Sequence, residues 1–221
     1  EMLPGGSLKD RIDDHGVLHP QQAIDAAISM AAGLGFAHEN NVVHRDVKLD
    51  NVLISSKGVM KVADFGIARI DDGNTGMTQT GAVMGTLAYM APEQRLSARR
   101  AGPQADLYAV AASLYVLISN RNPIELYSED MQADAFTDLP EPLIEFLKKG
   151  CHFNPTERFD DADDIIVALN ELRKELPPLP EDAIPIYIPR TTTATKPTEK
   201  DITTLHTMWN TLIDEDSSGT F

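Results

Sequence analysis

The segment His44-Arg45-Asp46-Val47-Lys48-Leu49-Asp50-Asn51 decides the fold of this chain, together with Asp64-Phe65-Gly66 a short distance later. Between these motifs lie two strand-like runs, 52–54 and 59–63, and the residues that separate them, 55–58, have turn chemistry. This pattern predicts a small β-hairpin. Because a short hairpin brings the chain back to where it started, we expect the carboxylate of Asp64 to lie near Asn51 and Asp46.

The side chains that this hairpin would gather suit phosphoryl transfer. Asn51 and Asp64 offer two hard oxygen ligands, and Mg²⁺ prefers one or two protein oxygens completed by water and substrate phosphate. Asp46, if it stays off the metal, can accept a proton from a hydroxyl substrate. Lys48 can neutralise negative charge on the transferred phosphoryl group.

These two motifs and a third, Ala91-Pro92-Glu93, resemble the H-R-D-x-K-x-x-N, D-F-G and A-P-E signatures of protein kinases, over about residues 1–172. In detail the chain is similar to bacterial eukaryotic-like (Hanks-type) Ser/Thr kinases, most clearly in residues 64–69, 78–80 and 85–94. The resemblance implies that Asp46 is the catalytic base, that Lys48 contacts the phosphate, and that Asn51 and Asp64 bind Mg²⁺. It therefore implies transfer of the γ-phosphate of ATP to Ser or Thr hydroxyls of protein substrates.

The resemblance also implies roles outside the reacting groups. Thr86 would lie in the substrate-docking loop near Asp46 and Lys48. Glu93 would form a buried ion pair with Arg158. Structural roles are implied for a further set of residues, with Asp106 anchoring the catalytic loop: His44, Arg45, Phe65, Gly66 and Asp106.

The first residues, Glu1-Met2-Leu3, resemble the kinase hinge. Backbone groups of Glu1 and Leu3 would then bond adenine, with Ser7 near the ribose and Leu53 beneath the base. The Gly-rich phosphate loop, the strand lysine and its glutamate partner do not precede Glu1. We therefore expect a C-terminal lobe that starts at the hinge, with the N-terminal lobe absent. Because misplacing reacting groups by about 1 Å can cost ~10²-fold in rate, such a fragment should have little or no activity alone.

Arg45 beside the catalytic acid needs either a partner or a regulatory anion. A phosphothreonine adds about −1.5 to −2 charge and can order a segment by pairing with Arg. The resemblance places such sites at Thr78 and Thr80, with Thr75 as a third choice. The alternative is that these threonines only make the loop soluble.

The hydrophobic pattern predicts a mainly α-helical fold with small β-hairpins. Helices are expected over residues 20–40, 107–118, around 143–147 and at 165–172, and a long exposed loop is expected over 66–85. Acidic residues before position 165 suit a helix N-terminus. The expected organisation is a kinase C-terminal lobe at 1–172, a Pro/Thr-rich linker at 173–204, and the start of an EF-hand or an acidic tail at 205–221.

Two features depart from the kinase pattern without removing a reactive group. Leu49 stands where the family usually has Pro, and Ala111 where the central helix usually carries Gly. We expect altered packing at most. A function of another class also stays open, namely a noncatalytic kinase lobe that acts as a docking or regulatory module. The presence of all four groups, Asp46, Lys48, Asn51 and Asp64, favours the enzyme.

Composition limits the partners and the compartment. Nineteen Lys and Arg against 34 Asp and Glu give a formal charge of −15, which disfavours nonspecific binding of nucleic acid. The single Cys151 excludes an intrachain disulfide and indicates a reducing compartment. There is no apolar run long enough for a membrane span and no signal-peptide pattern. We expect a cytoplasmic segment, whose parent protein could be anchored in a membrane elsewhere.

The end of the chain, residues 214–221, resembles the first eight positions of an EF-hand loop. Oxygen ligands stand at positions 1, 3 and 5, and Gly219 at position 6. The glutamate of position 12 would fall after Phe221, so a Ca²⁺ site is incomplete within this chain. A plain acidic tail is the alternative interpretation.

Overall fold

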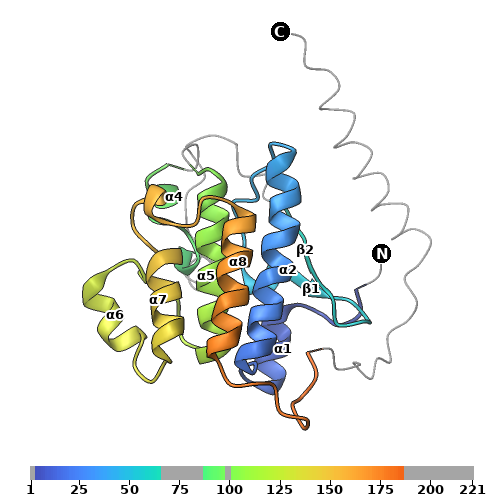
Figure 1. Ribbon diagram of the computed structural model, residues 1–221. Helices are drawn as coiled ribbons and strands as arrows, with labels where there is room; N and C mark the ends of the chain where they lie inside the picture. Colours follow the sequence, from blue (N-terminus) through green and yellow to red (C-terminus); the bar gives the residue numbers. More distant parts are fainter. Residues whose placement is uncertain (1–2, 66–86, 98–100, 187–221) are drawn as a thin grey trace, which may run out of the picture. The chain divides into compact units, whose positions relative to one another are not determined.

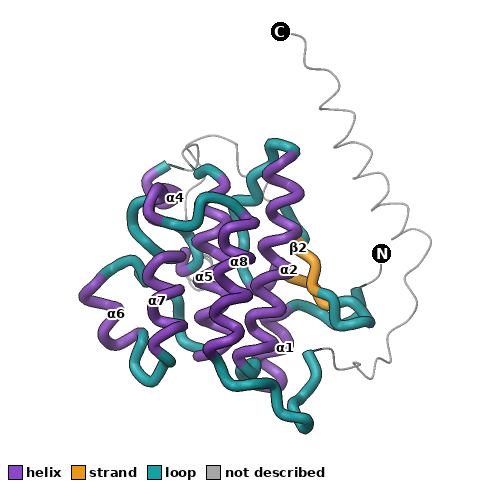
Figure 2. The backbone as a smooth tube through the Cα atoms, in the orientation of Figure 1, coloured by secondary structure: helices purple, strands orange, loops and turns teal. Residues whose placement is uncertain are grey.

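The computed structural model describes residues 3–65, 87–97 and 101–186, all within one compact unit, Glu1–Pro189. This part of the chain is mainly helical, with one two-stranded sheet at its side (Figure 2). Its elements in chain order are α1 (Leu8–His15), α2 (Pro20–Glu39), the 3₁₀ helix η1 (Leu49–Asn51), β1 (Val52–Ile54), β2 (Met60–Val62), α4 (Pro92–Leu96), α5 (Pro103–Ser119), α6 (Glu129–Ala135), α7 (Glu141–Gly150), η4 (Pro155–Glu157) and α8 (Ala162–Glu175). The predicted fold class, mainly α with a small hairpin, is confirmed for these residues.

Helix α5 forms the centre of the core. All its residues from Ala105 to Leu117 are buried, because the helix is apolar around most of its circumference. Helices α2 and α7 pack against it, and α8 packs against both α2 and α7 (Figure 1). The polar exception in its first turns is Asp106, which is only 1% exposed and faces the segment before the hairpin.

Helix α2 follows the helix expected at 20–40. His19 and Gln22 form a capping box at its start, and Pro20 occupies the first turn, where its missing N–H costs nothing. The helix passes close to α8 at Gly35, where a Cβ atom would lie 2.7 Å from the Cβ of Ala162. Glycine at this position therefore sets how closely the two helices approach.

The hairpin forms as expected from the sequence. β1 and β2 are antiparallel, with Val52 opposite Val62 and Ile54 opposite Met60. The turn uses the Ser55 hydroxyl, which accepts from the backbone N–H of Val59 at 3.0 Å. Gly58 has a φ of 75°, a left-handed conformation that glycine adopts without steric cost.

Beyond the expected boundary at residue 172, helix α8 continues to Glu175, and the following residues fold back. We call residues 176–186 the C-terminal strap. Gln21 Nε2 donates to Pro177 O at 2.9 Å, and Gln22 Nε2 donates to Ile184 O at 2.7 Å. Arg11 Nε lies 3.4 Å from Pro185 O. Proline lacks a backbone N–H, so a proline-rich segment has few donors for its own carbonyls, and donors on α1 and α2 hold it against the core.

No helix within the described ranges has both the length and the apolar character that crossing a bilayer requires.

Candidate active site

The turn that carries His44 is held by hydrogen bonds on both sides of the imidazole ring. Nε2 lies 3.0 Å from Ala63 O, and Nδ1 accepts from the backbone N–H of Asp46 at 3.2 Å. A carbonyl can only accept, so Nε2 carries the proton and the ring is in its Nε2–H form. The ring of Phe65 lies 4.5 Å from it, centroid to centroid. His44 therefore joins the residues before the hairpin to those after it.

Asp106 fixes the backbone of the same turn from the central helix. Its Oδ2 accepts from His44 N–H and its Oδ1 accepts from Arg45 N–H, both at 2.8 Å. His38 Nε2 is also 2.8 Å from Oδ2. A buried carboxylate is costly without partners, and here it has three.

Asp46 belongs to this turn, and its side chain is 14% exposed. Lys48 Nζ is 3.4 Å from its Oδ2. Asn51 Nδ2 donates both to the backbone carbonyl of Asp46 at 2.8 Å and to Oδ2 at 3.2 Å. These contacts hold the carboxylate in one orientation beside a positive charge.

Asn51 and Asp64 lie at the two ends of the hairpin. Ala63 N–H donates to Asn51 O at 2.8 Å, so Ala63 lies opposite Asn51, and Asp64 is the residue that follows this pair. Asp64 is exposed and has a φ of 58°, a conformation that Asp tolerates better than most residues. The bonds of Asn51 to Asp46 use its amide nitrogen. An amide oxygen and a carboxylate fit Mg²⁺, which completes its shell with water and phosphate.

No group of three or more His, Cys, Asp or Glu side chains suited to a metal ion occurs among the residues that the structure describes.

Arg158 and Glu93, which are 65 residues apart in the sequence, form an ion pair. Nη1 and Nη2 of Arg158 donate to Oε1 and Oε2 of Glu93, both at 2.8 Å, and the guanidinium is 3% exposed. The planar fork of Arg matches a carboxylate in this way. The pair ties α4, which begins at Pro92, to the segment before α8.

The backbone of Arg45 is strained, and its side chain has a buried nitrogen without a hydrogen bond among the described residues. Its φ is 64°, unfavourable for a residue with a Cβ atom. Its Nε is buried and has no hydrogen-bond partner within the described part of the chain. Arg45 lines a small pocket together with Asp46, Tyr89, Met90 and Gln94.

The segment at the start of the chain runs beside β1. Gly5 N–H donates to Ile54 O at 3.0 Å, and Ser7 forms an isolated antiparallel bridge with Leu53. Leu3 and Leu53 are half-buried. Ser7 caps α1 through a capping box with Asp10, an element that the sequence analysis did not predict. The Ser-x-x-Asp pattern at 7–10 was the signal that could have found it.

Several expected site residues lie outside the described residues. These are Glu1, Gly66, Thr75, Thr78, Thr80 and Thr86, together with the EF-hand-like residues 214–221.

Two residues near the site were missed by sequence reasoning. His38 binds Asp106, and Gln94 Nε2 donates to Arg45 O at 2.7 Å. Neither forms a spacing pattern with its partner, because the partners are 68 and 49 residues away. Only helix packing brings them together.

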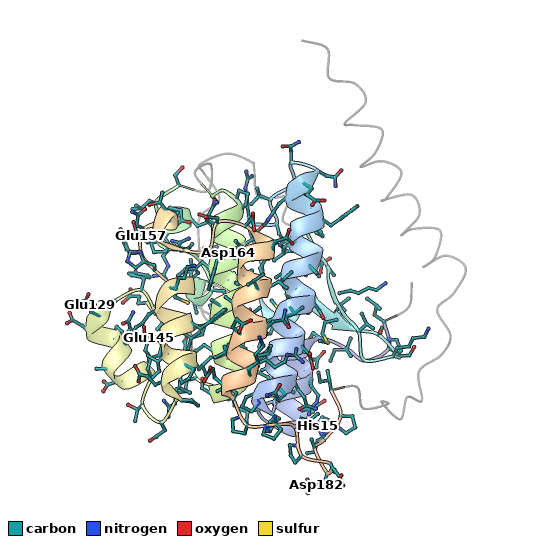
Figure 3. The ribbon with its side chains drawn as sticks, viewed as in Figure 1. His15, Glu129, Glu145, Glu157, Asp164 and Asp182 are labelled. Carbon is teal, nitrogen blue, oxygen red and sulfur yellow. The ribbon has the colours of Figure 1, made fainter. Side chains whose placement is uncertain are left out.

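Much of the acidic charge lies away from this site. Glu129, Glu145 and Glu157 are exposed on α6, α7 and η4, as Figure 3 shows. The site itself contains the positive groups Arg45 and Lys48 beside the carboxylates of Asp46 and Asp106.

Comparison with known proteins gives a consistent result. Residues 1–167 match the family model described as protein kinase domain. The chain is 32% identical over 197 residues to serine/threonine-protein kinase PknL of Mycobacterium tuberculosis, covering 84% of this chain and 49% of that protein. It is 34% identical over 183 residues to PknD of the same organism, covering 77% and 27%.

A shorter match is to a probable serine/threonine-protein kinase, CE0033, of Corynebacterium efficiens, at 41% identity over 126 residues. It covers 57% of this chain and 19% of that protein. The chain thus spans from about a fifth to about half the length of these relatives.

Proposed function

The chain belongs to the protein kinase family, and we propose that its described residues form the C-terminal lobe of a Ser/Thr protein kinase that uses Mg²⁺ and ATP. The observation that carries this proposal is the arrangement of Asp46. Its carboxylate is oriented by Asn51 and Lys48, while Asp106 holds the backbone that precedes it. Such preorganisation is what positions a catalytic base.

Each group of the site has a proposed task. Asp46 accepts the proton of a substrate Ser or Thr hydroxyl as the oxygen attacks the γ-phosphorus. Lys48, 3.4 Å from Asp46, stabilises negative charge on the transferred phosphoryl group. Asn51 and Asp64 hold Mg²⁺, which would neutralise charge on the phosphates of ATP. Thr86 is proposed to lie in the substrate-docking loop.

The nucleotide is proposed to bind beside β1. Backbone groups of Glu1 and Leu3 would bond adenine, and Leu53 would pack beneath the base. Ser7 is proposed to lie near the ribose, but its hydroxyl already donates to Asp10 Oδ2 at 2.9 Å. A ribose hydroxyl would have to share the oxygen of this cap.

Regulation by phosphorylation is proposed from Arg45. A buried guanidinium nitrogen without a described partner is costly, and a phosphate would supply acceptors for it. Thr78 and Thr80, then Thr75, are the proposed acceptors. Mass spectrometry of the active protein should find phosphate there, and a T78A/T80A double variant should lose activity. Undiminished activity of that variant would contradict the proposal.

The function is tested by phosphate transfer in the protein as its gene encodes it. Wild-type protein should transfer ³²P from ATP to Ser or Thr substrates only with Mg²⁺ present. Asp46→Asn should lower kcat by about 10²–10⁴-fold, because it removes the base while keeping the shape. Asp163→Asn, on the exposed face of α8, is the matched control and should leave kcat unchanged.

Two results would argue against a kinase. One is full activity in the Asp46→Asn variant. The other is no transfer by wild type while it binds a partner protein, which would favour the noncatalytic docking or regulatory module.

A further inference from the structure

The peptide between Arg45 and Asp46 is held by a side chain from outside the three signature motifs. Gln94 Nε2 donates to Arg45 O at 2.7 Å. Gln94 is half-buried on α4, directly after Glu93, and lines the same pocket as Arg45 and Asp46. The position of α4 is in turn fixed by the pair between Glu93 and Arg158. Gln94 therefore contacts the turn from a helix whose position is fixed.

Five backbone polar groups of residues 44–46 have side-chain partners. Asp106 accepts from the N–H groups of His44 and Arg45, and His44 Nδ1 accepts from Asp46 N–H. Asn51 donates to Asp46 O. The fifth group, Arg45 O, is bound by Gln94. Gln94 completes a set whose other members all belong to the expected kinase site.

The bond matters because Arg45 is in the left-handed region, at a φ of 64°. A residue with a Cβ atom stays there only when its surroundings hold it. The Arg45–Asp46 peptide can relieve this strain by rotating, and that rotation changes the direction in which the Asp46 side chain leaves the backbone. Gln94 and His44 hold the two ends of this peptide against rotation.

We propose that Gln94 is a positioning residue for Asp46, an inference that rests on the proposed phosphotransfer. It holds the Arg45 carbonyl and thereby fixes the backbone that aims the catalytic carboxylate. It also links the segment after the substrate-docking loop to that carboxylate. Loss of the bond should lower the rate of the chemical step and leave substrate binding intact.

The test uses two variants of Gln94 in the protein as its gene encodes it. Gln94→Met keeps the length of the side chain but cannot donate, and Gln94→Glu presents an acceptor to the Arg45 carbonyl. We expect kcat to fall by about 10-fold or more for Met and further for Glu, since a displacement of about 1 Å can cost ~10²-fold. KM for ATP and for peptide should stay within about twofold, because binding groups are unchanged.

Gln104→Met is the matched control. Gln104 is also half-buried, and its Nε2 donates to a distant backbone carbonyl, Asp160 O, at 3.0 Å. Both Met variants should lower the melting temperature by a similar amount, but only Gln94→Met should lower kcat. Equal kcat in the two Met variants, or a rise in KM without a fall in kcat, would overturn the proposal.

A second measurement does not depend on activity. Hydrogen exchange at the Asp46 amide should be about 10-fold faster in Gln94→Met than in Gln104→Met, because the peptide is then held at one end only. Equal exchange would also overturn the proposal. If wild type transfers no phosphate, the proposed function fails, and the exchange rates still decide whether Gln94 holds this peptide.

Discussion

Arg158 shows, at the scale of a single residue, how a buried charge is accommodated in this fold. Its five N–H groups all have acceptors: the two carboxylate oxygens of Glu93 and the backbone carbonyls of His152, Gln104 and Phe153. A buried ion is tolerated only when its remaining donors are satisfied in this way. Arg158 thus holds three chain segments in place: the start of α4 at Glu93, the start of α5 at Gln104, and residues 152–153.

Cys151 gives a prediction at the same scale. The thiol is fully buried, and burial raises its pKa from 9.0 to about 12. Between these values the unfolded chain loses the thiol proton while the folded chain keeps it, so the free energy of unfolding falls as pH rises, by up to about 1.4 kcal/mol per pH unit. Denaturant unfolding from pH 8 to 10 should show a steeper decline for wild type than for Cys151→Ala.

The two proteins are compared by how steeply the free energy of unfolding falls with pH, because Cys151→Ala also loses packing and is therefore less stable at every pH. The window ends at pH 10, the ordinary pKa of tyrosine, since burial also raises the pKa of Tyr89 and Tyr108. Identical slopes for the two proteins would mean that the thiol does not cause the alkaline loss of stability.

At the scale of elements, the close packing of helices depends on small residues at crossing points. Gly35 of α2 meets Ala162 of α8, and Gly150 of α7 meets Ala111 of α5, where an added Cβ would lie 2.6 Å from the Ala111 Cβ. The sequence departs from the kinase pattern at Ala111, and the neighbouring glycine leaves room for its methyl group. The packing therefore accepts Ala at this position of the central helix.

Substitution by alanine should change the stability of the protein in opposite directions at Gly33 and Gly35 of helix α2. At Gly35 the new Cβ would lie 2.7 Å from Ala162, an overlap that should destabilise by about 1–3 kcal/mol. At Gly33 the nearest atom is Val62 Cγ2 at 3.7 Å, so the better helix former should stabilise by about 0.5–1 kcal/mol. Thermal and urea unfolding measure both. Destabilisation by both variants would mean that α2 needs glycine for its own conformation.

At the scale of the whole molecule, the C-terminal strap connects the end of the core to its beginning. Gln21 donates to Arg173 O and Leu176 O at the end of α8, and Gln22 binds Ile184 O. Burial lowers the pKa of Arg11, whose Nη1 lies 3.4 Å from Gly16 O. Residues 184 and 185 of the strap therefore lie beside α1 and α2, of which α1 is the helix that follows the proposed hinge.

The strap predicts a change in local protease sensitivity. Gln22→Glu removes the donor to Ile184 O and keeps the oxygen that accepts from His19 N–H in the capping box, and a hydrogen bond of about 1 kcal/mol corresponds to roughly fivefold more frequent local opening. Cleavage after Glu181 by a glutamate-specific protease should accelerate by about that factor. Gln132→Leu, which removes a 2.9 Å bond to Leu126 O elsewhere, is the control. Equal cleavage rates in the two variants would show that Gln22 does not hold the strap.

Local features of this fold could be predicted from the sequence, whereas short helices and distant contacts could not. Helices α2, α5, α7 and α8 and the hairpin were predicted because apolar spacing and turn residues are local patterns. The short α1, α4 and α6 were missed, because five to eight residues carry too little periodicity. Residues 176–186 were expected to be part of a linker, since proline-rich composition does not reveal that donors elsewhere bind its carbonyls.

The sequence by itself determined the family, the main helices and the hairpin between Asn51 and Asp64, because signature motifs, apolar spacing and turn residues are local patterns. Only the tertiary structure decided the contacts of Gln94 with Arg45, of His38 with Asp106 and of Gln22 with Ile184. Their partners lie 49 to 162 residues apart. Such pairs depend on how whole helices pack, and no pattern of neighbouring residues encodes that arrangement.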